Sequence, residues 1–286
     1  MTGTGDNVNA SICAGLESAA RHLASQGAYE KSLEKCNEAL NLCPELIEVL
    51  RLRSNLLVHL GAFTEAIEDI DKALSLRPRS QDCLYERGFA NLRAGSLEAA
   101  LEDFGRCLAQ QADFIPALSS RSFILMCQKR HSEALCDIQR VIALRPGNDA
   151  DMHNKAVLLA IMGRYREAIR DYVAAIQINP RSGGSHNNLA WLLATAPDDS
   201  VRDGPKAVEH ARKALEIGMN SGWMDTLAAA LAESGDFEAA IAAQKRAYEM
   251  SQPKNKAIQR RIAVYEQRLS YASWRKEKQK EKNNAT

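Results

Sequence analysis

Four basic side chains recur along the chain, and each is followed sixteen residues later by an aspartate. The pairs are Arg53 and Asp69, Arg87 and Asp103, Arg121 and Asp137, and Lys155 and Asp171. Opposite charges at a constant spacing could form a ligand-binding surface or a set of internal ion pairs. Because acids and bases are equal in number, we predict internal pairs between neighbouring helices. An exposed pair is worth about 0–1 kcal/mol, whereas losing one partner of a buried pair costs about 3–5 kcal/mol.

An acidic cluster, Asp198, Asp199 and Asp203, could suggest a cation site. A calcium loop of the EF-hand type, however, requires oxygen ligands at alternating positions and a closing glutamate, and these are missing. Asp203 is followed by Gly204 and Pro205, an order that is typical of a helix start with an acidic cap and an early proline. We therefore predict a structural role for Asp203.

Catalytic and metal-binding signatures are absent from the sequence. It contains no phosphate-binding glycine loop, no H-E-x-x-H pair and no G-x-S-x-G nucleophile turn. The six histidines are dispersed, and none stands at zinc-finger spacing from any of the seven cysteines. We expect a protein that is not an enzyme and has neither a metal nor a cofactor.

Composition narrows the class of partner and the compartment. The formal charge of +1 over 286 residues gives no reason to expect nucleic acid or a membrane surface as the partner. The first residues lack the basic start and apolar core of a signal peptide, and no apolar run approaches the ~20 residues of a membrane span. Most cysteines lie in apolar stripes, which is typical of a reducing compartment, so we expect a cytoplasmic protein.

Three residue types keep one 34-residue register, which indicates an internal repeat. The glycines are Gly27, Gly61, Gly95 and Gly163, with Lys129 in the missing slot; the alanines are Ala66, Ala100, Ala134 and Ala168; and the prolines are Pro44, Pro78, Pro146 and Pro180. Glycine permits the turn between two helices, alanine lets them approach closely, and proline ends the second helix. The register therefore predicts a series of helix pairs.

The pattern resembles the tetratricopeptide repeat family, whose turn glycine, aromatic, alanine and proline are matched by Gly163, Tyr165, Ala168 and Pro180. The segment 189–207 carries about five extra residues, and with 225–240 it is similar to the terminal repeats of many bacterial repeat proteins. The resemblance implies an all-α fold, a right-handed solenoid of stacked antiparallel helix pairs with a C-terminal capping helix.

The repeat divides the chain into four kinds of segment. We expect a disordered N-terminus at 1–12 and seven repeats over 13–252, at about 13–46, 47–80, 81–114, 115–148, 149–182, 183–220 and 221–252. A capping helix should follow at 253–273, with the stripe Ile258, Ile262, Tyr265 and Leu269 covering the last repeat, and a charged tail at 274–286.

The family resemblance also places a binding groove on one face of the first helix of each repeat. At about 100° per residue, positions 2, 5, 9 and 12 point away from the packed stripe, toward the concave groove of such families. The predicted groove residues are Arg51, Asn55, Tyr85, Phe89, Leu92, Phe123, Met126, His153, Val157, Asn187 and Trp191. Several large apolar side chains in this set would be unusual on a monomer surface unless a partner binds there. The alternative is that neighbouring helices or the chain's own tail already cover them.

One ligand mode of the family is unfavourable here. Domains that clamp acidic C-terminal tails use basic and amide residues, and only Arg51 and Asn55 match, whereas Glu86, Pro116 and Ser120 do not. We therefore predict a scaffold that binds a helix or an extended apolar peptide of a protein partner. Self-association into a homo-oligomer through the same residues, and less favourably RNA binding, remain alternatives.

Overall fold

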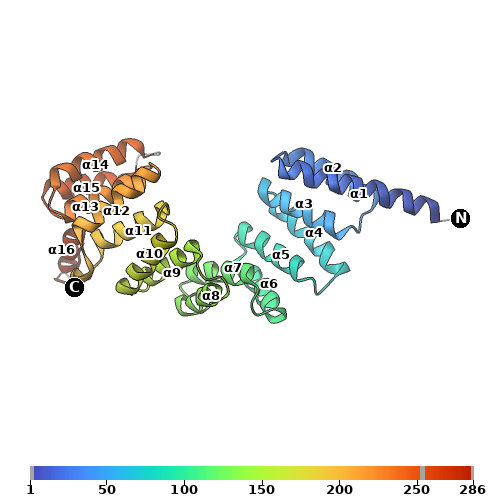
Figure 1. Ribbon diagram of the computed structural model, residues 1–286, viewed down its shortest axis with the longest axis horizontal. Helices are drawn as coiled ribbons and strands as arrows, with labels where there is room; N and C mark the ends of the chain where they lie inside the picture. The colour runs from blue at the N-terminus through green and yellow to red at the C-terminus, as the bar shows by residue number, and fades with distance from the viewer. Residues whose placement is uncertain (1–2, 252–254, 285–286) are drawn as a thin grey trace. The chain divides into compact units, whose positions relative to one another are not determined.

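The computed structural model describes residues 3–251 and 255–284, and within these ranges it contains sixteen α-helices, one short 3-10 turn and no strand. The chain divides into two compact units at residue 144, and in each unit the helices stack as neighbouring pairs (Figure 1). The predicted all-α solenoid of stacked helix pairs is confirmed.

Unit 1 comprises residues 1–144 and unit 2 residues 145–286. The helices of unit 1 are α1 (Gly3–Ser25), α2 (Tyr29–Leu42), α3 (Ile47–Leu60), α4 (Phe63–Leu76), α5 (Gln81–Ala94), α6 (Leu97–Gln110), α7 (Ile115–Cys127) and α8 (His131–Leu144). Those of unit 2 are α9 (Asp149–Ile161), α10 (Tyr165–Ile178), α11 (Gly183–Thr195), α12 (Gly204–Ile217), α13 (Ser221–Glu233), α14 (Phe237–Met250), α15 (Lys256–Glu266) and α16 (Tyr271–Asn284). The 3-10 turn Asp199–Val201 lies between α11 and α12.

The first helices of the pairs begin where the sequence places the repeat starts, at Ile47, Gln81, Ile115, Asp149, Gly183 and Ser221. The N-terminus differs from the expected disorder at 1–12, because α1 is already helical from Gly3; residues 1–2 lie outside the described part. Cys13 and Ala20 are buried, and once a packed stretch has nucleated a helix, its extension costs little.

The register alanines explain how closely two helices of a pair approach. Ala66, Ala100, Ala134 and Ala168 are all fully buried. At Gly88, which faces the second helix of its pair, an added Cβ atom would lie 2.8 Å from Cε1 of the Phe104 ring. A larger residue at this position would force the helices apart, which accounts for the small residues at this register.

The turns between paired helices use left-handed backbone conformations, with φ of +75 to +83° at Gly27, Gly61, Gly95 and Gly163. Lys129 occupies the missing glycine slot and adopts the same turn with φ of +62°. A side chain in this conformation costs about 1–2 kcal/mol because its Cβ crowds the following carbonyl oxygen. The turn geometry is therefore kept even where the glycine is lost.

We expect Lys129→Gly to stabilise unit 1 by about 0.5–1 kcal/mol, since the relief of strain exceeds the added entropy of the unfolded chain. The reciprocal change Gly95→Ala places a methyl group in open space at φ of +83°, so its loss of about 1 kcal/mol would report backbone strain alone. Urea unfolding midpoints measure both effects. A loss of stability in Lys129→Gly would contradict the turn assignment.

The predicted ion pairs are all present and lie within the helix pairs. The shortest contacts are 2.5 Å for Arg53–Asp69, 2.6 Å for Arg87–Asp103, 2.7 Å for Arg121–Asp137 and 3.0 Å for Lys155–Asp171. Arg87 also reaches Asp71 of the preceding pair at 2.7 Å, as Arg53 reaches Asn37 at 2.8 Å. Arg53 and Arg87 thus connect successive pairs. All four cations are paired with their predicted aspartates, so the structural interpretation is confirmed.

The long connection of the sixth pair is also a structural element. Asp203 caps α12 by accepting a hydrogen bond from the Lys206 amide at 3.1 Å, and Pro205 lies in the first turn, as predicted. Asp198 accepts bonds from Ser200. The acidic cluster is thus used in capping and turn formation.

The C-terminal region differs from the predicted single capping helix and charged tail. Its expected start at 253–254 and the last two tail residues lie outside the described part. From Lys256 the chain forms α15, turns at Arg268 with φ of +54°, and continues as α16 to Asn284. The break arises because Ser270 caps a new helix, accepting a hydrogen bond from the Ser273 amide at 3.3 Å.

Burial on α15 also differs from the predicted stripe. Ile258 and Tyr265 are buried and Leu269 is half-buried, whereas Ile262 lies in a shallow surface depression with Gln259 and Ala263. The residue that faces the core beside Ile258 is Arg261, which pairs with Asp225 of α13. Apolar residues of α15, together with the Arg261–Asp225 ion pair, therefore join α15 to the seventh helix pair.

Candidate functional site

The predicted groove residues fall in both units of the chain. The unit 1 face consists of Arg51, Asn55, Tyr85, Phe89, Leu92, Phe123 and Met126, and the unit 2 face of His153, Val157, Asn187 and Trp191. All lie on first helices of their pairs: α3, α5 and α7 in unit 1, α9 and α11 in unit 2.

The polar end of the unit 1 face is internally satisfied. Arg51 binds Glu86 through two hydrogen bonds of 2.8 and 2.9 Å and also contacts Asp82 and Glu48. The hydrogen bond to Glu86 raises the pKa of Arg51 further above its ordinary value. A guanidinium surrounded by carboxylates cannot recognise an acidic peptide, which agrees with the unfavourable clamp pattern in the sequence.

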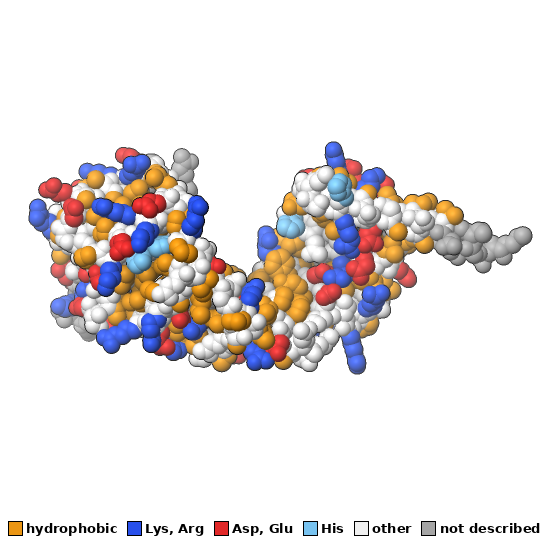
Figure 2. Space-filling view, viewed as in Figure 1, with side chains coloured by type: hydrophobic (Ala, Val, Ile, Leu, Met, Phe, Trp, Pro, Cys, Tyr) orange, Lys and Arg blue, Asp and Glu red, His pale blue; other side chains and the backbone are white. Residues whose placement is uncertain are grey.

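The aromatic residues of α5 serve mainly as packing groups. The Tyr85 ring lies 5.8 Å from that of Phe104 and 5.5 Å edge-on from that of Phe114. Phe89 packs against a cluster that includes Val58, and Leu92 packs against the main core of the unit. Apolar side chains gather along α5 (Figure 2), but these three are half-buried and already contribute to the fold.

On α7 one apolar side chain is open to solvent. Phe123 is 51% exposed, and Met126 beside it on the same face is half-buried. The neighbouring Ile124 is fully buried, so the helix separates its packing residues from Phe123. Within the unit 1 face, Phe123 is the exposed large apolar side chain.

Two residues of the unit 2 face are held by neighbours. His153 shares a hydrogen bond of 2.9 Å with the Ser185 hydroxyl, and its ring meets that of Tyr172 edge-on at 5.6 Å. Burial lowers the pKa of His153 below its ordinary value, so the ring is neutral at physiological pH. Asn187 donates to Asn188 at 3.1 Å. Neither side chain is placed as an open ligand group.

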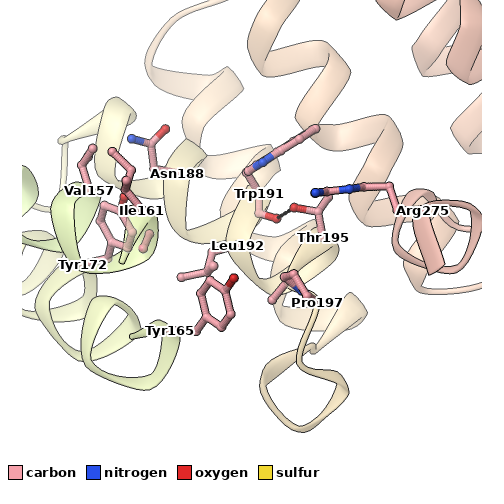
Figure 3. Close-up of a pocket in the computed structure, with 12 residues that line it drawn as sticks. Val157, Ile161, Tyr165, Tyr172, Asn188, Trp191, Leu192, Thr195, Pro197 and Arg275 are labelled. Atoms are coloured by element: carbon pink, nitrogen blue, oxygen red, sulfur yellow. Dashed lines mark hydrogen bonds between the residues drawn. The ribbon is translucent and has the colours of Figure 1, made fainter. Parts of the chain in front are cut away.

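The other two residues, Val157 and Trp191, line one cavity of about 380 Å³ (Figure 3). Its walls come from α9, α10 and α11, from the connection after α11 and from Arg275 of α16, and they include Ile161, Tyr165 and Tyr172. Ile161 is 54% exposed at the rim. A volume of this size accommodates one or two large apolar side chains and lies at the lower end of the range for ligand sites.

The cavity combines aromatic walls with a few polar groups. Burial raises the pKa of Tyr172 to about 12, so its hydroxyl stays protonated, and it is hydrogen-bonded with Asn188. The Thr195 hydroxyl is occupied in a bond of 2.7 Å to the Trp191 carbonyl. In Figure 3 the rings of Tyr165 and Tyr172 and the Ile161 side chain border the same hollow as Trp191.

The far side of Trp191 is covered by the C-terminal helices. The Arg261 guanidinium lies 5.8 Å from the Trp191 ring and 5.3 Å from the Tyr271 ring, and Tyr271 is 5.8 Å from Trp191. Trp274 stacks on Tyr271 at 5.7 Å. This arrangement, which we call the Trp191 cluster, places α16 beside the cavity.

A second cavity of about 220 Å³ continues from the first along α16. Thr195, Pro197 and Arg275 line both cavities, and the second is also lined by Ala272, Lys276 and Gln279. Arg275 extends from α16 toward Thr195 and Trp191 (Figure 3). The two cavities therefore form a short track from an aromatic hollow to a basic helix.

Sequence reasoning missed Ile161, Asn188, Arg261 and Arg275 as residues of this region. Arg261 could have been found, because a charge between the apolar residues Ile258 and Tyr265 of one helical stripe requires a buried partner. Ile161 follows the last predicted groove position of α9 and shows no separate signal. Arg275 belongs to a run of charged residues that is typical of a solvated tail. Its position in the fold depends on the helix break at Arg268.

Paired helices with left-handed turns, stacked on their neighbours, define an α-helical repeat protein. Models of the tetratricopeptide repeat match residues 51–113 and 152–182. These two parts of the chain therefore contain tetratricopeptide repeats. Repeats of this family generally mediate protein–protein interaction.

Solved structures share the fold at low sequence identity. A tetratricopeptide repeat protein from Parabacteroides merdae superposes with a TM-score of 0.68 at 17% identity, over 89% of this chain and 99% of that one. The C-terminal part of a repeat-containing protein from Cytophaga hutchinsonii gives 0.65 at 15%, over 84% and 97%. YrrB, a TPR protein with an unusual peptide-binding site, gives 0.50 at 22%, over 59% and 88%. No curated protein matches the sequence significantly.

Two other kinds of feature are absent from residues 3–251 and 255–284. Over these residues no helix has the length and apolarity needed to cross a bilayer. The same part of the chain holds no group of three or more histidine, cysteine or carboxylate side chains placed to bind a metal ion.

Proposed function

We propose that this protein is an interaction scaffold that binds an extended peptide segment of a protein partner on the unit 2 face. The observation that carries the proposal is the cavity of about 380 Å³, in which the predicted groove residues Val157 and Trp191 meet. An extended segment fits this cavity better than a helix does. A helix requires a long apolar groove, whereas α16 lies beside Trp191 and leaves only a short open cavity.

The lining favours an apolar or aromatic side chain. Ile161, Val157 and Leu192 supply apolar surface, and the tyrosine rings offer aromatic edges and faces. Burying one large side chain contributes about 1.5–3 kcal/mol, which raises the affinity of a peptide by about ten- to a hundredfold. YrrB has a peptide-binding site on a related fold, and this supports the same class of ligand here.

A second candidate, association with another copy of the chain, is supported by the 51% exposed Phe123 on the unit 1 face. An exposed phenylalanine beside a half-buried methionine is a small apolar patch of the kind found at interfaces. We further propose a cytoplasmic location, since four of the cysteines are buried apolar residues without a disulfide.

Ile161→Asp tests the peptide site with little cost to folding, because the side chain is 54% exposed. A carboxylate at the apolar rim should reduce the affinity for cavity-binding peptides by about ten- to a hundredfold. This factor corresponds to the free energy of one lost apolar contact. Decapeptides selected from a random displayed library on the wild-type protein would be titrated against the wild type and the variant. The matched control is Met219→Asp, which changes a 58% exposed apolar residue outside the cavity of unit 2.

The two variants should separate clearly. Retained binding by Met219→Asp and lost binding by Ile161→Asp would support the site. If the selected peptides bind Ile161→Asp as tightly as the wild type, the cavity is not where they bind.

A further inference from the structure

Resting on the proposed function, we infer that the bound segment carries a carboxylate close to its large apolar side chain, and that Arg275 of α16 binds this carboxylate. The apolar side chain occupies the first cavity, and the carboxylate lies in the second. The C-terminal helix α16 is therefore part of the binding site.

Arg275 stands where the two cavities join. It lines both of them, together with Thr195 and Pro197. Its guanidinium lies 5.8 Å from the Tyr271 ring, so one face packs on an aromatic surface while the donor groups along its edge stay available. A planar guanidinium held in this way is suited to a carboxylate, which it can bind through two parallel hydrogen bonds.

The other cations near the track already have partners. Arg261 is paired with Asp225, and Lys276 is paired with Asp199 of the 3-10 turn. Within the described ranges no carboxylate is paired with Arg275. Arg275 is thus the cation beside the aromatic hollow whose charge is left for a ligand.

Charge along α16 adds to the selectivity. From Arg275 to Lys282 the helix carries five basic residues and two acidic ones, in a chain whose formal charge is only +1. The excess of positive charge favours approach of an acidic segment and disfavours a basic one. Complementary charge therefore points to an acidic and apolar peptide.

The geometry of an extended chain fits adjacent cavities that share a wall. Side chains at positions i and i+2 project to the same side, separated by about 6.6 Å. A large apolar residue in the first cavity would place the side chain two positions away beside Arg275. The simplest recognised core is an aromatic or aliphatic residue, any residue, and then a carboxylate, from Asp, Glu or a free C-terminus.

The test uses the full chain and pools of decapeptides that are random except for a fixed Phe-x-Glu core. Two matched pools carry a fixed Phe-x-Gln or a fixed Ala-x-Glu core. In a third pool, Phe stands two residues before the C-terminus, so that the free C-terminal carboxylate replaces the Glu side chain. Wild-type protein should retain the Phe-x-Glu pool about three- to tenfold better than the Phe-x-Gln pool, with a smaller difference at high salt. The free-C-terminus pool shows whether the carboxylate comes from a side chain or a chain end.

Arg275→Gln should abolish the preference for Glu over Gln, whereas Arg212→Gln, which removes the same charge from α12, should retain it. Gln279→Glu is a second variant, which places a like charge in the second cavity and should weaken retention of the Glu pool alone. Helicity and melting temperature of each variant confirm folding.

Equal retention of the Glu and Gln pools by the wild type would overturn the inference. If Ile161→Asp still abolished both pools, the proposed peptide site would stand without its carboxylate preference. If Ile161→Asp had no effect, the proposed site itself would be wrong. The inference would also be overturned if the protein bound a single-stranded RNA oligonucleotide through Arg275 and retained none of the peptide pools.

Discussion

Asp225→Ala should lower the free energy of unfolding of unit 2 by about 3–5 kcal/mol, because it leaves a buried guanidinium without its carboxylate. Asp225 is only 8% exposed and receives two bonds from Arg261, at 2.9 and 2.5 Å. It also accepts a bond of 2.6 Å from the buried amide of Gln244, which in turn reaches the Ile258 carbonyl at 2.9 Å. One carboxylate thus connects α13, α14 and α15.

Urea unfolding followed by circular dichroism measures the loss, and hydrogen exchange would show reduced protection of α15 and α16. The matched control is Glu167→Ala, which breaks the surface pair of Arg164 and Glu167 at 2.7 Å and should change stability by less than about 1 kcal/mol. If the two variants lose similar stability, the Asp225 pair is not the connection described here.

Phe104→Ala should destabilise unit 1 by about 3–5 kcal/mol, since its ring is fully buried against Gly88 and Tyr85 and would leave a cavity. Phe123→Ala removes the same atoms from a residue that is 51% exposed and should change stability by about 0.5–1 kcal/mol. The contrast distinguishes a packing phenylalanine from one on a free surface.

Chemical unfolding of both variants gives the stability comparison, and sedimentation of Phe123→Ala tests association between copies. If Phe123→Ala costs as much as Phe104→Ala, Phe123 belongs to the core and cannot serve a partner. A sedimentation coefficient that depends on concentration in the wild type but not in Phe123→Ala would support the self-association candidate.

The helix pairs were predictable because each depends on contacts within one 34-residue period. Turn glycines, buried alanines and terminal prolines act locally, so their spacing alone identifies the pairs and the Arg53–Asp69 type of ion pair. The same logic accounts for Lys129, whose left-handed conformation follows from the register although its residue type disfavours it.

The candidate site was only partly predictable, because helical position does not specify what packs against a side chain. Tyr85 and Trp191 occupy equivalent faces of their helices, yet one meets Phe104 within its own pair and the other meets Tyr271 from the C-terminal helix. The second contact joins residues eighty positions apart, beyond the repeat period. Arg275 could not be placed for the same reason.

The most direct test of the central claim is a hydrogen-exchange footprint of the full chain with and without a selected peptide. We expect slowed exchange in α9 and α11 around Val157, Ile161 and Trp191, and in the first turns of α16, with little change in α2, α4 and α6. Protection confined to unit 1, or to the second helices of the pairs, would contradict the account.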